Sequence, residues 1–286
     1  MTHFGTAFRK IRQSKNLSLE SVAAGIMSKQ GLSSFEREKT DISVQLLDQL
    51  LKKIHLTIDE FFHICEIKET RHQMLDQLKS LFIQEDLDGI DLFIAHFRQR
   101  FQYDRDIQYL HLAIIGDIFR SKLNHTAISI QDSAMIKNYL YQVESWGDYE
   151  LELFANTLFA LSPEDVQIIY TTVLKNIQAI DCHDDLSNHK FTDLMFNLVA
   201  YSIDRKRFAD AATYLEQTRQ TIAANDLYAS FLEKYDEALL AFLKDPNASS
   251  QQCWHYVEML KELGNVELFE FYAHDLRQHE QEKLNY

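Results

Sequence analysis

Residues 27–42 read Met-Ser-Lys-Gln-Gly-Leu-Ser-Ser-Phe-Glu-Arg-Glu-Lys-Thr-Asp-Ile and decide how the N-terminal part of the chain folds. Ser28 is a typical N-cap, and a short helix over about 29–37 follows it. Leu32 and Phe35 lie three residues apart and predict a buried stripe that packs on neighbouring helices. The opposite face then carries small polar and basic side chains, which is what a helix needs to lie in a DNA major groove.

The outward face of this helix offers donors and acceptors for both bases and phosphates. Gln can bond adenine through two hydrogen bonds, Ser donates or accepts at base edges, and Lys or Arg serves guanine or phosphate. We expect base contacts from Gln30, Ser33 and Ser34. We expect phosphate contacts from Lys29, Arg37 and Lys39. A solvated surface helix is the alternative, but the tight turn and the predicted partner helices around this one favour DNA contact.

Four further short helices are predicted around this one. The first covers about 4–15, and the second begins after Ser18 and ends at Gly25. The fourth runs from a cap at Asp41 or Ser43 to Ile54, and the fifth begins at Thr57, as the Ser, Thr and Asp caps and the Gly stop indicate. Residues 1–66 therefore predict a compact five-helix domain with a helix-turn-helix at its centre.

The chain beyond residue 66 has longer amphipathic segments, at about 68–84, 87–102, 105–122, 131–143, 147–160, 164–180, 187–204, 207–224, 227–243, 250–263 and 266–283. Paired helices of this length with short polar joints favour a helix-hairpin solenoid. The segment Asp210-Ala-Ala-Thr-Tyr-Leu-Glu, followed by spaced aromatic residues, resembles a tetratricopeptide repeat. We predict an all-α protein in which residues 67–286 form a tetratricopeptide-like helical-repeat domain.

Composition supports the helical prediction, because 286 residues contain only seven Gly and two Pro. Charge is unevenly distributed. Residues 1–66 hold nine Lys and Arg against eight Asp and Glu, whereas the whole chain has a formal charge of −14. Within residues 1–39 the count is seven Lys and Arg against three Asp and Glu. A locally basic N-terminal domain, here called the head, on an acidic body fits DNA contact through the head alone. No signal-peptide core and no apolar run near the ~20 residues of a membrane span is visible, so we expect a cytoplasmic protein.

Catalytic and metal-binding patterns are missing from the sequence. It has no His-Glu-x-x-His, no Cys-x-x-Cys and no Gly-x-Ser-x-Gly. His183-Asp184-Asp185 beside Cys182 is better explained as a polar joint between helices than as a metal site. The three cysteines, 65, 182 and 253, are too far apart for a disulfide framework. We therefore expect no enzyme, no metal and no cofactor.

Two stretches of the chain resemble the Rgg/MutR regulators of Gram-positive bacteria, and they occur in the same order as in that family. The N-terminal domain of these regulators is a helix-turn-helix of the Cro/repressor (XRE) type. The first comprises residues 17–23, 25–37, 41–43 and 58–61, among them Leu-Ser-Leu-Glu-Ser-Val-Ala and Leu-Ser-Ser-Phe-Glu-Arg. The second is Tyr-Leu-Tyr-Gln-Val-Glu-Ser-Trp-Gly-Asp-Tyr-Glu-Leu-Glu-Leu-Phe-Ala-Asn at 139–156. From the first matched residue to the last, 17–156, the two stretches span about half of the chain.

The resemblance implies a homodimer that binds promoter DNA and senses a short apolar signalling peptide with its helical-repeat domain. It implies peptide contacts from Asn156, which matches the family's Phe-x-Asn position, since Asn amides can satisfy both backbone groups of an extended peptide. Asn197 is a further candidate because it lies in an otherwise apolar helix. Phe154 and Tyr201 are candidate groove residues. For each residue the alternative is an ordinary place in the core.

The resemblance also implies a partly buried ion pair between Arg12 and Glu36, with Arg12 structural and not a DNA contact. Two positions depart from the family pattern. Glu38 stands where the family usually has Gly, which predicts a strained or reshaped exit from the third helix. Leu19 stands where XRE domains place a phosphate-contacting Gln, so we do not expect that contact.

Two alternatives to a peptide-switched regulator stay open. The first is the same architecture with a protein partner or another small ligand as its effector. The second is a helical-repeat scaffold whose head binds proteins. The basic side chains near the head's start and the polar face at Gln30, Ser33 and Ser34 argue against the scaffold.

Overall fold

The computed structural model describes residues 3–65, 71–179 and 185–284, and within them every regular element is a helix. The chain divides into two compact units, Met1–Met74 and Leu75–Tyr286. The boundary that we predicted from the sequence, between residues 66 and 67, lies eight residues earlier. The all-α prediction is confirmed for the described residues.

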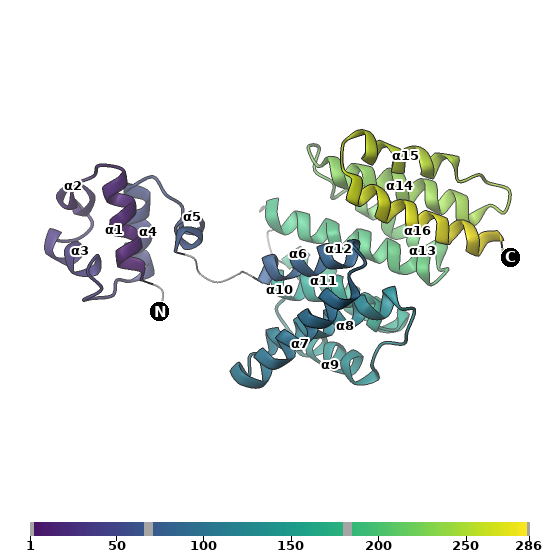
Figure 1. The fold of residues 1–286 in the computed structure, drawn as a ribbon, viewed down its shortest axis with the longest axis horizontal. Helices are drawn as coiled ribbons and strands as arrows, with labels where there is room; N and C mark the ends of the chain where they lie inside the picture. The colour runs from purple at the N-terminus through teal and green to yellow at the C-terminus, as the bar shows by residue number, and fades with distance from the viewer. Residues whose placement is uncertain (1–2, 66–70, 180–184, 285–286) are drawn as a thin grey trace. The chain divides into compact units, whose positions relative to one another are not determined.

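The first unit contains five short helices, drawn in purple to blue in Figure 1. They are α1 (Phe4–Ser14), α2 (Leu19–Ala23), α3 (Lys29–Phe35), α4 (Val44–Lys53) and α5 (Ile58–Ile64). Ser18, Ser28, Ser43 and Thr57 each accept a backbone N–H of the first turn that follows, so four of the five helices begin at a side-chain cap. Of the two caps considered for the fourth helix, the structure selects Ser43.

The core of the first unit is built by one stripe from each helix. Phe8, Leu50 and Phe61 are completely buried at its centre. Leu19 packs against the same core, which explains why it can replace a polar residue at the start of α2. Leu32 and Phe35 are buried as predicted, so the back of α3 is held by the core.

The second unit contains the longer helices that the sequence predicts. They are α6 (Arg71–Ile83), whose first residues belong to the first unit, α7 (Leu87–Asp104), α8 (Ile107–Leu123), α9 (Ile130–Gln142), α10 (Asp148–Thr157), the 3-10 helix η1 (Leu158–Ala160), α11 (Pro163–Ala179), α12 (Asp185–Asp204), α13 (Phe208–Thr218), α14 (Leu227–Lys244), α15 (Gln251–Glu262) and α16 (Val266–Leu284). The sequence predicts eleven segments, and the described residues of this unit form eleven α-helices. The largest boundary error is at α13, which ends six residues before the predicted position.

These helices pack mainly on their neighbours along the chain: α7 on α8, α12 on α13, α13 on α14 and α15 on α16. In addition α12 packs on α10 and α14. Contacts between adjacent helices and between alternate helices together are typical of a helical-repeat stack.

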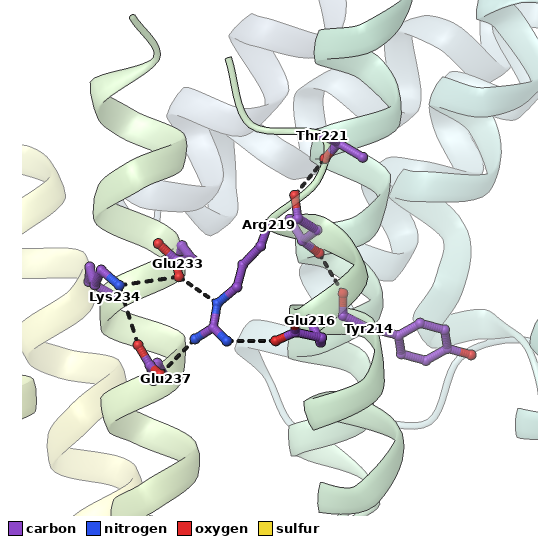
Figure 2. Close-up of polar contacts among 8 residues, drawn as sticks. Tyr214, Glu216, Arg219, Thr221, Glu233, Lys234 and Glu237 are labelled. Atoms are coloured by element: carbon purple, nitrogen blue, oxygen red, sulfur yellow. Dashed lines mark hydrogen bonds and ion pairs between the residues drawn. The ribbon is translucent and has the colours of Figure 1, made fainter. Parts of the chain in front are cut away.

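Polar contacts on the surface join successive helices of the stack. Figure 2 shows Arg219, which directly follows α13, donating to Glu216 of α13 and to Glu233 and Glu237 of α14. The three carboxylates raise the pKa of the Arg219 guanidinium, with the hydrogen bond to Glu233 contributing most. No helix in the described part of the chain is both long enough and apolar enough to cross a membrane.

Candidate DNA-binding face and ligand cavity

The buried ion pair between Arg12 and Glu36 fastens the end of α3 to α1. Arg12 donates from Nε to Glu36 Oε1 at 2.5 Å and from Nη2 to Glu36 Oε2 at 2.8 Å. Its Nη1 donates to the carbonyl of Leu17 at 2.6 Å. The hydrogen bond with Glu36 raises the pKa of the Arg12 side chain, although burial alone would lower it. This is the pair that the resemblance implies, and its fork geometry leaves Arg12 no free donor face for DNA.

A close backbone approach gives a second fastening of α3 to α1. A Cβ atom at Gly5 would lie 1.9 Å from the carbonyl oxygen of Phe35, so only glycine fits there without a shift of the backbone. This contact joins the first turn of α1 to the last residue of α3. Sequence reasoning missed Gly5, because a glycine inside a helix gives no local signal of a distant carbonyl.

Glu38 supplies a third fastening and explains the departure from the family pattern. Its φ of 56° is left-handed, as at a glycine, and it completes a helix-ending motif in which Glu38 N–H donates to Phe35 O and Lys39 N–H to Ser34 O. A glutamate is strained in that conformation. Its carboxylate, however, accepts the backbone N–H of Thr6 at 2.7 Å, in the first turn of α1. A negative charge at a helix N-terminus is stabilising and offsets the strain.

The residues predicted to contact DNA lie on the side of α3 that faces away from the core, or just beyond its end. Lys29, Gln30, Arg37 and Lys39 are exposed, and Ser33 and Ser34 are half-buried. The helix ends at Phe35, two residues earlier than predicted, so Arg37 and Lys39 lie in the turn that follows.

Two of these side chains are already engaged within the head. Arg37 donates from Nε to Ser33 Oγ at 3.2 Å and also from Nη2. Lys29 lies 3.4 Å from Glu20 of α2, and both side chains are largely exposed. Exposed pairs of this kind contribute little to stability, so both basic groups can be transferred to phosphate.

The second unit contains a partly open cavity of about 980 Å³. Its apolar wall includes Phe82, Leu123, Ile203, Phe208, Leu243 and Phe271. These residues come from α6, α8, α12, α13, α14 and α16, so helices distant in sequence meet around one space. The volume lies at the upper end of the roughly 300–1,000 Å³ typical of sites for small ligands.

Several charged residues at the cavity are paired with one another or with backbone carbonyls. Lys122 lies 3.2 Å from Asp204, and its ammonium group stands 4.1 Å from the centre of the Phe159 ring. Lys283 donates to the carbonyls of Phe242, Asp245 and Ala248, which end α14 and the turn after it. Burial raises the pKa of the Asp275 carboxyl, and His279 at 3.7 Å opposes this rise.

The four residues predicted for peptide contact do not line this cavity. Phe154 is completely buried and Tyr201 is 2% exposed, with its hydroxyl donating to Leu161 O, so neither offers a ligand a free side-chain face. Asn156 donates to Glu152 O within α10, and Asn197 donates to Ala155 O at 3.1 Å, linking α12 to α10. The structure therefore buries Phe154, Asn156 and Tyr201 at α10 and α12 and leaves Asn197 half-buried, and a peptide contact from any of the four stays a prediction.

The stretch 139–156, which carries the second resemblance, runs from the end of α9 into α10 and contains the residues that begin α10. Glu150 accepts the N–H of Gly147 through Oε2 and the hydroxyl of Tyr139 through Oε1, both at 2.9 Å. Trp146 is 3% exposed and meets Phe154 edge-on. Its indole N–H has no partner among the described residues. The Trp-Gly and Tyr-Glu pattern is thus explained by a helix start and its packing.

No group of His, Cys, Asp and Glu in the described part of the chain is arranged to hold a metal ion. Cys182, His183 and Asp184 lie outside the described residues. Cys65 and Cys253 are free thiols, and burial raises the pKa of both.

Comparisons with known proteins assign both units. A helix-turn-helix family model matches residues 8–61, and the model described as the C-terminal domain of the HTH-type transcriptional regulator Rgg matches residues 95–274. A putative transcriptional regulator from Listeria monocytogenes EGD-e is similar in fold, with a TM-score of 0.79 at 21% identity over 98% of both chains.

Two further solved structures share the fold. The SHP pheromone receptor Rgg2 of Streptococcus dysgalactiae has a TM-score of 0.71 at 20% identity, over 96% of this chain and 99% of that chain. PrgX in its complex with cCF10 has a TM-score of 0.72 at 20% identity over the same shares. The Rgg model covers more than half of the 286 residues, and its family is one of regulators and not of enzymes. The chain belongs to the Rgg family of helix-turn-helix, DNA-binding transcriptional regulators.

Proposed function

We propose that this regulator acts as a homodimer whose activity is switched by a short apolar signalling peptide bound in the cavity of the second unit. The observation that carries the proposal is the cavity itself, with an apolar wall drawn from six helices. Structures of similar fold include a pheromone receptor and a bacterial peptide pheromone/receptor complex, which makes a peptide the first ligand to test. A protein partner or another small ligand is the alternative effector.

The proposed DNA contacts follow from the exposed side of α3. Gln30 and Ser34 contact base edges, Ser33 contacts a base or holds Arg37, and the three basic residues neutralise phosphates. A homodimer places two such helices on two half-sites of one operator.

Selection of DNA from a random duplex pool by the full-length protein gives the site on which these roles are tested. Replacing Gln30 and Ser34 by Ala should relax the selected consensus while the mass in sedimentation remains that of a dimer. Arg37→Ala should leave the consensus intact and reduce the slope of log affinity against log salt by about one. An unchanged consensus for Gln30→Ala with Ser34→Ala would remove α3 as the reading element.

The peptide site is tested by calorimetry with a synthetic library of apolar five- to eight-residue peptides. If the cavity binds peptide, Ile203→Glu, which places a charge on its apolar wall, should abolish binding. Asn197→Ala serves as the comparison, because Asn197 lies outside the cavity wall. Loss of binding with Asn197→Ala and not with Ile203→Glu would move the site to α10 and α12. No binding by any library peptide would favour the alternative effectors.

A further inference from the structure

The first and last helices of the second unit meet although they are far apart in sequence. Gln84, directly after α6, donates to Glu267 of α16 at 3.0 Å across 183 residues. The ring of Phe82 in α6 lies 5.9 Å from that of Phe271 in α16. Glu85 lies 3.4 Å from His274 of α16. We call these six residues the α6–α16 contact.

The same residues form part of the cavity wall. Phe82 and Glu85 line the cavity from the side of α6, and Phe271 and His274 line it from α16. A ligand in the cavity therefore lies against both halves of the α6–α16 contact. Its apolar groups would add buried surface between the two helices, which favours the closed contact over the open one.

The polar pairs of the α6–α16 contact are weak. The side chains of His274 and Glu85 are each about half exposed, at 52% and 51%, and the Gln84–Glu267 hydrogen bond is exposed as well. Solvated pairs of this kind hold helices loosely. A contact with few strong interactions is one that a ligand can shift between two states.

The helix α6 connects the cavity wall to the helix-turn-helix domain along the chain. The boundary between the two units falls between Met74 and Leu75, inside α6. The chain that leaves the cavity wall towards the N-terminus is thus α6 itself, and the helix-turn-helix is attached to its beginning. Within one chain, no other covalent path joins the cavity to the head.

We propose that the α6–α16 contact is the regulatory element of the cavity: its closure by the ligand fixes α6 and thereby changes DNA binding by the head. This inference rests on the proposed function, because it assigns a route to the switching of that site. The route requires no direct contact between ligand and head, only two states of one helix that both sites influence.

The inference is tested with two changes that need no ligand: a cross-link that holds the α6–α16 contact closed and a substitution that opens it. Gln84→Cys with Glu267→Cys in the full-length protein is cross-linked by a short bismaleimide, and each single-cysteine variant treated in the same way controls for Cys65, Cys182 and Cys253. His274→Glu places a second carboxylate against Glu85 and opens the contact, with His274→Gln as its uncharged match. The readout is affinity for the DNA site selected from the random pool.

Cross-linking and His274→Glu should shift DNA affinity in opposite directions, each by at least about fivefold, the lower end of typical allosteric coupling. His274→Gln and the single-cysteine controls should stay within twofold of the unmodified protein. Hydrogen exchange of α6 amides verifies that the cross-link protects α6 and that His274→Glu exposes it. Equal DNA affinity for both variants, with those exchange changes present, would overturn the inference.

Failure of the inference can be told from failure of the proposed function. If library peptides bind the cavity but closure and opening leave DNA affinity unchanged, the peptide site stands and the route through α6 is wrong. If no peptide binds but closure and opening still shift DNA affinity in opposite directions, the route stands and the ligand is of another class.

Discussion

Two arginines fasten neighbouring helices in the two units, and they do so in opposite environments. The Arg12 and Glu36 side chains in the first unit are 8% and 3% exposed. The Arg219 side chain in the second unit is 35% exposed and meets three carboxylates, of which Glu216 and Glu237 are half exposed or more (Figure 2). Arg219 has more ionic partners, yet water competes with them. The comparison teaches that the stability an ion pair gives to helix packing depends on its burial and geometry and not on the number of partners.

The largest expected effect is at the buried pair. Arg12→Met leaves the Glu36 carboxylate buried without its partner, which should destabilise the first unit by about 3–5 kcal/mol. Hydrogen exchange of the α1 and α3 amides in the full-length protein measures this loss. The double variant with Glu36→Leu removes both charges and should recover most of the stability. If the single variant lost less than the Arg219 variant described below, the comparison would be reversed.

A smaller effect follows from a buried histidine in the second unit. His111 is 3% exposed, its Nδ1 lies 2.6 Å from the hydroxyl of Tyr149, and burial lowers its pKa to about 4. The unfolded chain takes up this proton near pH 6.5 and the folded chain does not, so stability falls as pH drops from 6.5 towards 4. At pH 5 the loss should be about 2 kcal/mol.

Denaturant unfolding between pH 7 and 5 measures this loss, with exchange of α8 and α10 amides locating it in the second unit. His111→Asn removes the titrating group and should flatten the pH dependence over this range. An equal slope in the wild type and in His111→Asn would assign the acid sensitivity to other groups.

Substitutions at Glu38 test whether an exposed carboxylate stabilises the first unit when it accepts a hydrogen bond from a backbone N–H. Glu38→Ala keeps the left-handed strain and loses the bond to Thr6, so we expect a loss of about 1 kcal/mol in the first unit. Glu38→Gly loses the same bond but relieves the strain, so its stability should stay near that of the wild type. Thermal unfolding of the two variants, compared directly, separates strain from capping. Equal losses would show that strain at this position is negligible.

The smallest effect is expected at the exposed cluster. Arg219→Ala should lower stability by no more than about 1 kcal/mol, and this difference should shrink further in high salt. Denaturant unfolding at low and high salt measures it, with Glu216→Gln as a milder match that leaves Glu233 and Glu237 in place. A salt-independent loss of several kcal/mol would mean that the cluster behaves like the buried pair at Arg12.

Local patterns predict the elements of this protein because helix periodicity and caps depend on residues close in sequence. Ser18, Ser28 and Thr57 begin helices as predicted, and the eleven longer segments are all present. The exposed polar side of α3 also follows from spacing alone, since Leu32 and Phe35 fix the face that is buried.

The cavity of the second unit could not be predicted in this way. Phe154 and Asn156 were chosen from a motif, and the structure shows that the motif starts and packs α10. The cavity is formed where Phe82 of α6 and Phe271 of α16, from opposite ends of the second unit's sequence, approach one another. No spacing rule connects residues 189 positions apart.

The sequence by itself determined that the chain is helical, where its helices begin, and that its first helices present a polar face suited to DNA. Only the tertiary structure decided that Glu38 caps α1, that Gly5 lies against the Phe35 carbonyl, and which residues enclose a cavity. The physical reason is the distance along the chain over which each kind of interaction acts. Helix formation and capping are satisfied within a few residues, whereas packing depends on which surfaces of distant helices fit together.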